Sequence, residues 1–291
     1  MHGRMNKRNA RKNRDEARDG FTLVELLVIV GILAALGCVV FPAMAKTGSQ
    51  SRAAGCLNSH RQLWAVWRMY ADDNSDKVIY NMGIPGIQNE VAQASYRNWA
   101  NNYVDWTVSN GLNTNKLVLD RGLLGPYLHT NYSAYKCPAD IYLSSQQIAS
   151  HWTARARSFS MNAFFGRYNS DPNDPTASGR NEFFTQYRQW LKTAEVIKPA
   201  LTWVFIDEQA DSINDGLFLN STTASSWGDL PGSYHDGAAN LSFVDGHGET
   251  HKWLSNTSIF PVGFTYPPPP PFDALGVTDF HWLLARSCVL Y

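Results

Sequence analysis

The sequence lacks the charge bias and the motifs that would point directly to nucleic-acid binding or to catalysis. Charged residues make up only 17% of the 291 residues and the formal net charge is zero, which excludes a globally basic nucleic-acid-binding protein. No Gly-x-Ser-x-Gly elbow, phosphate-cradling loop, dinucleotide fingerprint or His-Glu-x-x-His pattern occurs. We therefore expect neither an enzyme nor a nucleic-acid partner. The apolar content of 44% predicts a well-packed core.

A short basic segment precedes a long apolar segment at the N-terminus. Residues 1–20 carry seven basic and three acidic side chains, whereas the rest of the chain carries 18 basic and 22 acidic ones. Residues 26–45 contain no charge, a length that suffices for a membrane-spanning helix and exceeds the core of an ordinary signal peptide. The basic segment predicts that the N-terminus stays in the cytoplasm while the rest of the chain is exported. A simple signal anchor is the alternative.

One carboxylate, Glu25, lies at the start of the apolar segment, where it would cost about 2.5–3.5 kcal/mol deep in lipid. The run Gly20-Phe21-Thr22-Leu23-Val24-Glu25 resembles the processing site of type IV prepilins, a family that comprises the pilins and the pseudopilins of type II secretion. The resemblance implies that a prepilin peptidase cleaves between Gly20 and Phe21 and that Phe21 becomes N-methylated. It also implies that Glu25 pairs with the N-terminal amine of a neighbouring filament subunit.

The helical pattern continues beyond the apolar segment. Over residues 53–71, apolar side chains recur at steps of three and four, which predicts an amphipathic helix that ends in the acidic segment 72–76. We therefore divide the chain into four parts. These are a leader peptide (1–20), a transmembrane or filament-core helix (21–45), its amphipathic continuation (46–76) and a globular α+β domain (77–291).

The globular part has short apolar runs between segments rich in glycine, proline and asparagine. We predict strands at residues 116–119, 202–206, 216–219, 240–244 and 249–253, and a helix at residues 180–192. The fold class is therefore α+β. A long N-terminal helix packed on an antiparallel-sheet globular domain is the pilin-like architecture.

Residues 235–253 predict a β-hairpin, because Asp-Gly pairs occur at both of its turns. This segment resembles the His-x(9)-Asp-Gly signature found near the C-terminus of a large family of pilin-like proteins. His235 and the pair Asp245-Gly246 match that signature. The resemblance implies a pilin-like fold and export of the globular domain.

Histidines and carboxylates near this hairpin form a candidate cation site. The candidate ligands are Asp207, Glu208, His235 and Asp245, with His247 and His251 also in the hairpin. Imidazole and carboxylate suit zinc or a similar ion, whereas carboxylates combined with carbonyl oxygens would suit a structural calcium. The alternative is a purely structural role in which these side chains bond turn amides. We expect no cofactor, and a structural calcium ion is the alternative.

The four cysteines predict one disulfide. Cys38 lies in the apolar segment, and Cys288 has no evident partner. Cys56 and Cys137 are predicted to pair because an exported domain meets an oxidising compartment. Their bridge would close a loop of 81 residues and stabilise the fold by roughly 4 kcal/mol in the chain-entropy model. The alternative is a pair of buried thiols.

The sequence therefore predicts a structural subunit of a type IV pilus-like filament or a type II secretion pseudopilus. Its expected partners are prepilin peptidase, other pilin-like subunits and the inner membrane, which residues 21–45 would cross once. The globular domain would be periplasmic before assembly into the filament. The alternative is a filament-tip or membrane-anchored module for glycan binding or adhesion, through surface aromatics such as Trp99, Trp106, Trp152 or Trp227.

Overall fold

The computed structural model describes residues 22–266 and 268–291, with side chains for all of these except residues 35–47. The expected cleavage site at Gly20 and Phe21 and the expected leader peptide lie outside the described residues. The chain divides into two units, Met1–Thr47 and Gly48–Tyr291, and each is described by itself below.

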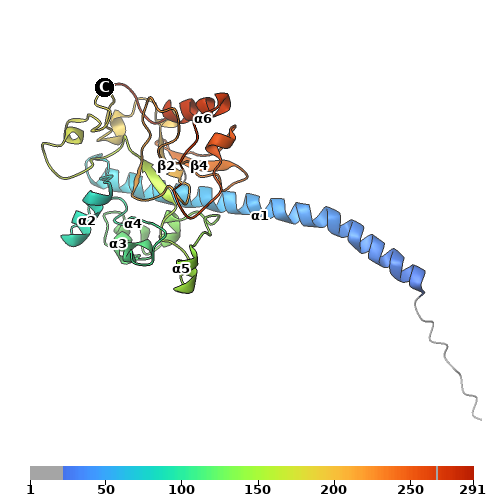
Figure 1. Ribbon diagram of the computed structural model, residues 1–291. Helices are drawn as coiled ribbons and strands as arrows, with labels where there is room; N and C mark the ends of the chain where they lie inside the picture. The colour runs from blue at the N-terminus through green and yellow to red at the C-terminus, as the bar shows by residue number, and fades with distance from the viewer. Residues whose placement is uncertain (1–21, 267) are drawn as a thin grey trace, which may run out of the picture. The chain divides into compact units, whose positions relative to one another are not determined.

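Helix α1 runs without interruption from Leu23 to Asp73, over 51 residues (Figure 1). Its first turn is closed by a capping box. Glu25 Oε2 accepts from the Thr22 backbone N–H at 2.8 Å, and Thr22 Oγ1 accepts from the Glu25 N–H at 3.3 Å. A search of the described residues finds no helix with both the length and the hydropathy needed to cross a membrane.

Within the unit Gly48–Tyr291, one face of α1 is buried. Cys56, Leu63, Trp67 and Tyr70 lie at steps of seven, four and three, so they form a continuous apolar stripe against the body. The amphipathic pattern predicted from the sequence is therefore confirmed by burial. The helix ends where Ser75 and Asp76 adopt positive φ values of 58° and 64°.

The body contains one five-stranded sheet. Its strands are β1 (Phe159–Asn162), β2 (Trp203–Asp207), β3 (Leu217–Phe218), β4 (Ala238–Phe243) and β5 (Gly248–Lys252), in the order β3-β1-β2-β4-β5. Among the five strands of this sheet, β1 and β3 pair in parallel and the other neighbouring pairs are antiparallel. The sheet is therefore mixed, and the fully antiparallel sheet expected from the sequence is wrong at this edge. After β2 the chain crosses β1 and enters the sheet again as β3, on the other side of β1. Strand β3 therefore runs parallel to β1 and antiparallel to β2.

Helices cover both faces of the sheet. On one face, Trp67 of α1 packs in a cluster with Phe159 and Phe205. On the other face, Phe280 of α6 (Ala274–Leu284) joins Ile206 and Leu241 (Figure 1). Strand β2 contributes to both clusters because side chains of a strand point to opposite faces. The other α-helices of the described residues precede β1 and are short: α2 (Ile84–Ala92), α3 (Leu117–Asp120), α4 (Gly125–Leu128) and α5 (Ser145–Ala149).

Two secondary-structure predictions are wrong. Residues 116–119 were expected as a strand, but α3 covers most of them, and Asn115 Oδ1 accepts from the Leu117 N–H at its start. A short apolar run does not distinguish a buried strand from a buried helical turn. Residues 180–192 were expected as a helix, but Asn181 Oδ1 accepts from the N–H groups of Phe183 and Phe184. This local bonding competes with helix formation.

Candidate functional site

A buried cluster of two cysteines, two histidines and one aspartate lies between α1 and the sheet. Cys56 and His60 are four residues apart on α1, so their side chains lie on one face of the helix. Asp207 ends β2 and points toward α1, while Cys137 and His235 come from two loops. Four of the five residues are completely buried, and His235 is 5% exposed. Segments distant in the sequence therefore meet at one point.

Asp207 is the centre of this cluster. Its Oδ1 accepts from His60 Nε2 and from Cys56 Sγ, both at 3.0 Å. Its Oδ2 accepts from His235 Nε2 at 3.2 Å and from the Asn240 backbone N–H at 2.9 Å. Burial alone would raise the pKa of Asp207, but the hydrogen bonds from the two imidazoles outweigh it and hold this pKa well below its usual range. The carboxylate is therefore ionised inside the core.

The imidazole of His235 and the thiol of Cys137 influence each other. His235 Nε2 lies 3.5 Å from Cys137 Sγ. Burial lowers the pKa of His235, but its contacts with Asp207 and Cys137 outweigh this effect and raise that pKa to about 10. Burial raises the pKa of the Cys137 thiol, whereas contacts with Cys56 and His235 lower it below its usual value. Cys137 is therefore the cysteine of the pair that ionises more readily.

The cation site expected from the sequence is only partly assembled. Asp207 and His235 are in contact, but Glu208 points to the opposite side of β2, where it accepts from Ser160 and Ser212. Burial raises the pKa of Glu208 to about 8. Asp245 is exposed in a turn, where its Oδ1 accepts from the His247 N–H at 3.2 Å. Glu208 and Asp245 therefore share no site with His235, because neighbouring strand residues face opposite sides and the turn lies at the surface.

The sequence analysis did not connect the cysteines with this site, and it did not single out His60. Cys56 and Cys137 are free thiols in the structure, and they belong with Asp207 and His235 to a group of ligand atoms within 4.8 Å of one another. Their disulfide stays a prediction. The only local signal for the missing members was the four-residue spacing of Cys56 and His60 on an amphipathic helix.

The His-x(9)-Asp-Gly segment lies along α1. Asp236 accepts from the Ser49 hydroxyl at 3.0 Å, Asn240 Nδ2 donates to the Ala53 carbonyl at 3.1 Å, and Trp64 Nε1 donates to the Val244 carbonyl at 3.3 Å. The two ends of the signature therefore both reach the helix. His235 does so through Asp207, and Gly246 does so by its close approach to the Trp64 ring.

His251, at the far end of the hairpin, has a different environment. Its ring stacks on Trp282 of α6, with centroids 3.5 Å apart, and its Nδ1 lies 3.8 Å from Glu249 Oε1. Burial lowers the pKa of His251 to about 4. The negative charge of Asp279 on α6 opposes this shift, and the positive charge of Arg286, just beyond the end of α6, adds to it. His251 is therefore neutral at pH 7 and separate from the cluster around Asp207.

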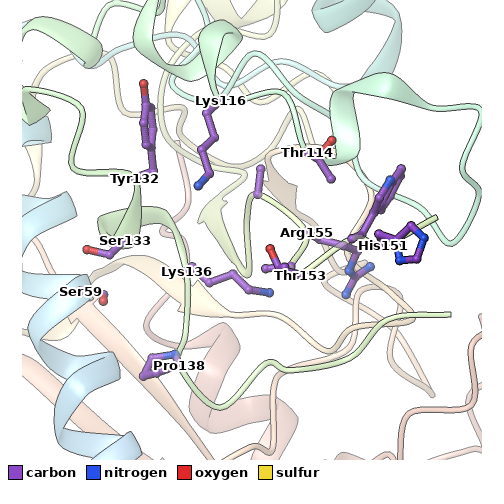
Figure 2. A pocket seen from close by; sticks show the side chains of 13 residues that line it. Ser59, Thr114, Lys116, Tyr132, Ser133, Lys136, Pro138, His151, Thr153 and Arg155 are labelled. Carbon is purple, nitrogen blue, oxygen red and sulfur yellow. The ribbon is translucent and has the colours of Figure 1, made fainter. Parts of the chain in front are cut away.

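An open hollow of about 680 Å³ lies on the surface of the body. Figure 2 shows that the side chains of Lys116 and Lys136 project into the same space from two segments, with Tyr132 beside them. Of the four tryptophans proposed as surface aromatics, Trp152 lines this hollow, and Trp106 packs 4.0 Å from the Arg155 guanidinium. Trp99 and Trp227 are buried, so the expectation that they are surface aromatics is wrong.

The chain matches no protein-family model, and no curated protein or solved structure is significantly similar to it. The buried cluster is therefore interpreted from its own chemistry. Thiol, imidazole and carboxylate groups at these distances can share protons or bind a soft or borderline metal ion, and the two thiols can form a disulfide when an external oxidant takes up two electrons and two protons.

Proposed function

We propose that the protein is a structural subunit of a type IV pilus-like filament or a type II secretion pseudopilus, with a pilin-like fold. The observation that carries this proposal is helix α1, which is continuous over 51 residues and begins with Glu25 in its first turn. Prepilin peptidase would act between Gly20 and Phe21, which precede this helix. Phe21 would then be N-methylated.

The surface of the first unit of the chain indicates that this unit contacts something other than water. The large apolar side chains between Leu23 and Leu33 are all exposed, with exposed fractions from 41% for Ile29 to 75% for Leu23. A contiguous apolar surface of this kind marks contact with lipid or with other protein. We assign it to the inner membrane before assembly and to neighbouring subunits in the filament, with the globular domain in the periplasm.

The contacts within the second unit support the proposal that α1 carries the folded body. Within Gly48–Tyr291, the helix is held by the buried cluster at Cys56 and His60 and by the hairpin contacts from Ser49 to Trp64. These contacts fix the body to the part of α1 that belongs to the same unit.

Glu25 provides the sharpest test, because the structure gives it a second role as a helix cap. Glutamine keeps the capping-box acceptor and loses the charge, whereas alanine loses both. If Glu25 pairs with the amine of a neighbouring subunit, Glu25→Gln impairs filament assembly about as strongly as Glu25→Ala. Sedimentation and electron microscopy of filaments sheared from cells measure this effect.

The matched control is Glu195→Gln, which neutralises an exposed carboxylate of the body and is expected to assemble normally. All three variants should leave the melting temperature of the body unchanged. Normal filaments from Glu25→Gln combined with defective filaments from Glu25→Ala would assign Glu25 to capping alone and contradict the pairing.

A second candidate function, a glycan-binding or adhesion module, is favoured by one observation. The hollow beside Lys116 combines the partly exposed aromatic rings of Tyr132 and Trp152 with polar groups, a combination suited to a sugar. In this case Trp152→Ala would weaken binding to an oligosaccharide array at least tenfold. Wild-type protein that binds no oligosaccharide on the array would remove this candidate.

A further inference from the structure

Four segments of the chain bring four metal-binding atoms together in the core of the body. Cys56 and Cys137 supply sulfur, His235 supplies Nε2 and Asp207 supplies a carboxylate oxygen, and these atoms all lie within 4.8 Å of one another. We propose that they bind one Zn²⁺ ion as a structural site. The site joins α1, the loop before Pro138, the end of β2 and the loop before β4.

The spacing of these atoms fits tetrahedral zinc. With Zn–S bonds of about 2.3 Å and Zn–N or Zn–O bonds of about 2.0–2.2 Å, neighbouring ligand atoms are roughly 3.3–3.8 Å apart. The observed separations are 3.0 Å for Cys56 Sγ to Asp207 Oδ1, 3.2 Å for His235 Nε2 to Asp207 Oδ2, and 3.5 Å for Cys137 Sγ to His235 Nε2. These three separations lie at or below the lower part of that range, and the others among the four ligand atoms are at most 4.8 Å, so shifts of up to about 1 Å would form the site.

Two neighbours already hold the carboxylate from outside the ligand set. His60 Nε2 donates to Asp207 Oδ1 at 3.0 Å, and the Asn240 N–H donates to Oδ2 at 2.9 Å. Zinc sites use such outer hydrogen bonds to orient their ligands. An ion would account for the contact of the buried Asp207 carboxylate with two imidazoles and the Cys56 thiol, and for the nearby Cys137 thiol.

The donor atoms select the metal and the role. Two sulfur ligands exclude calcium and magnesium, which take oxygen ligands. Four protein ligands without an exposed position are typical of a structural zinc site and not of a catalytic one. A disulfide between Cys56 and Cys137 would use the same two sulfur atoms, so one molecule holds either the bridge or the ion.

The metal content of the full-length protein tests the proposal. Protein purified without chelator is expected to contain equimolar zinc by plasma mass spectrometry, and removal of zinc is expected to lower the melting temperature. Cys137→Ser is expected to lose the zinc, whereas the control Cys288→Ser, which alters a thiol outside the cluster, should retain it. His60→Gln should keep the site but weaken zinc binding about 10–100-fold, as outer partners of zinc ligands do.

A measurement on the unmodified chain covers the case in which Cys137→Ser does not fold. Co²⁺ added to the zinc-free protein is expected to give the visible bands of a tetrahedral site together with thiolate-to-cobalt charge transfer. Three results would overturn the proposal: wild-type protein without zinc and without a cobalt spectrum, zinc retained equally in Cys137→Ser, or a native Cys56–Cys137 disulfide in peptides analysed without reduction.

Discussion

Gly246 lies where the hairpin turn touches helix α1, and it offers a quantitative test of this packing. Its φ of +97° is a conformation that L-residues rarely adopt. A Cβ added there would lie 2.7 Å from Trp64 Cη2 and 2.8 Å from Cζ2. The indole has little freedom to move away because its Nε1 donates to the Val244 carbonyl. Gly246→Ala therefore adds one methyl group at a point where neither the backbone nor the Trp64 indole can relax easily.

Two terms contribute to the expected loss of stability. The positive φ costs an alanine about 1–2 kcal/mol. Forcing a methyl group against a packed ring costs about 1–3 kcal/mol more. Alanine also lowers the conformational entropy of the unfolded chain, which restores about 0.4–1 kcal/mol of the free energy of unfolding. We therefore expect Gly246→Ala to lower the free energy of unfolding by about 1–5 kcal/mol, and Gly246→Val to lower it further.

Gly237→Ala is the matched control, because it has the same backbone strain without the ring. Gly237 has a φ of +82°, and an added Cβ would meet only Ile259 Cδ1, the flexible end of a side chain, at 3.1 Å. With the same strain and entropy terms but no clash with a ring, this variant should lose only about 0–2 kcal/mol of stability. Equilibrium denaturant unfolding of the full-length chain measures both variants. Trp64→Leu combined with Gly246→Ala should show a coupling energy of at least about 1 kcal/mol, because the leucine removes the ring that the methyl group strikes.

Two results would refute the reasoning about this turn. The first is that Gly246→Ala destabilises the protein no more than Gly237→Ala does. The second is that the effects of Gly246→Ala and Trp64→Leu simply add, with no coupling energy. Either result would mean that the Asp-Gly turn does not rest on the α1 indole.

Three further predictions concern processing, redox chemistry and pH. The mature protein should begin with N-methylated Phe21, and a chain sequenced from its natural host that retains residues before Gly20 would contradict this. After zinc is removed and the protein is exposed to air, Cys56 and Cys137 should form a disulfide detectable by mass spectrometry of non-reduced peptides, because their sulfur atoms already lie within 4.8 Å of each other. The folded-state pKa of His251, about 4, lies below its unfolded value of about 6.5. The unfolded chain therefore gains its proton first as the pH falls, and as much as about 3 kcal/mol of stability, complete above pH 6.5, is lost between pH 6.5 and 4. Calorimetric melting should show this loss in the wild type and a smaller one in His251→Phe.

The segments predicted as strands overlap β2, β3, β4 and β5, but no predicted segment covers β1. Residues 240–244 and 249–253 were expected as strands and overlap β4 and β5. Strand β1 was missed because its apolar–polar alternation covers only four residues, Phe159–Asn162, and its two polar side chains are buried as well. The side chain of Asn162 donates to the carbonyls of Trp203 and Ser287, contacts that exist only in the folded chain.

The candidate site could be predicted only as far as local sequence allowed. Asp207 was selected because it follows a predicted strand, and His235 because it lies with Asp245 and two further histidines in the predicted hairpin. The helix residues Cys56 and His60 lie 151 and 147 positions from Asp207 in the sequence. A pattern of neighbouring residues therefore could not show that these side chains meet. Their meeting depends on how the amphipathic face of α1 docks on the sheet. Glu208 was selected for the same reason as Asp207, but strand alternation places it on the other side.

The contacts between the hairpin and α1 also determine how the body responds to mechanical force. They run from Ser49 to Trp64, about 22 Å along the helix at 1.5 Å per residue. Tension parallel to the helix axis loads these contacts in shear, so they resist together and must rupture together. Tension perpendicular to the axis would instead peel them apart one at a time from the Ser49 end. The same set of contacts is therefore strong along the helix and weak across it.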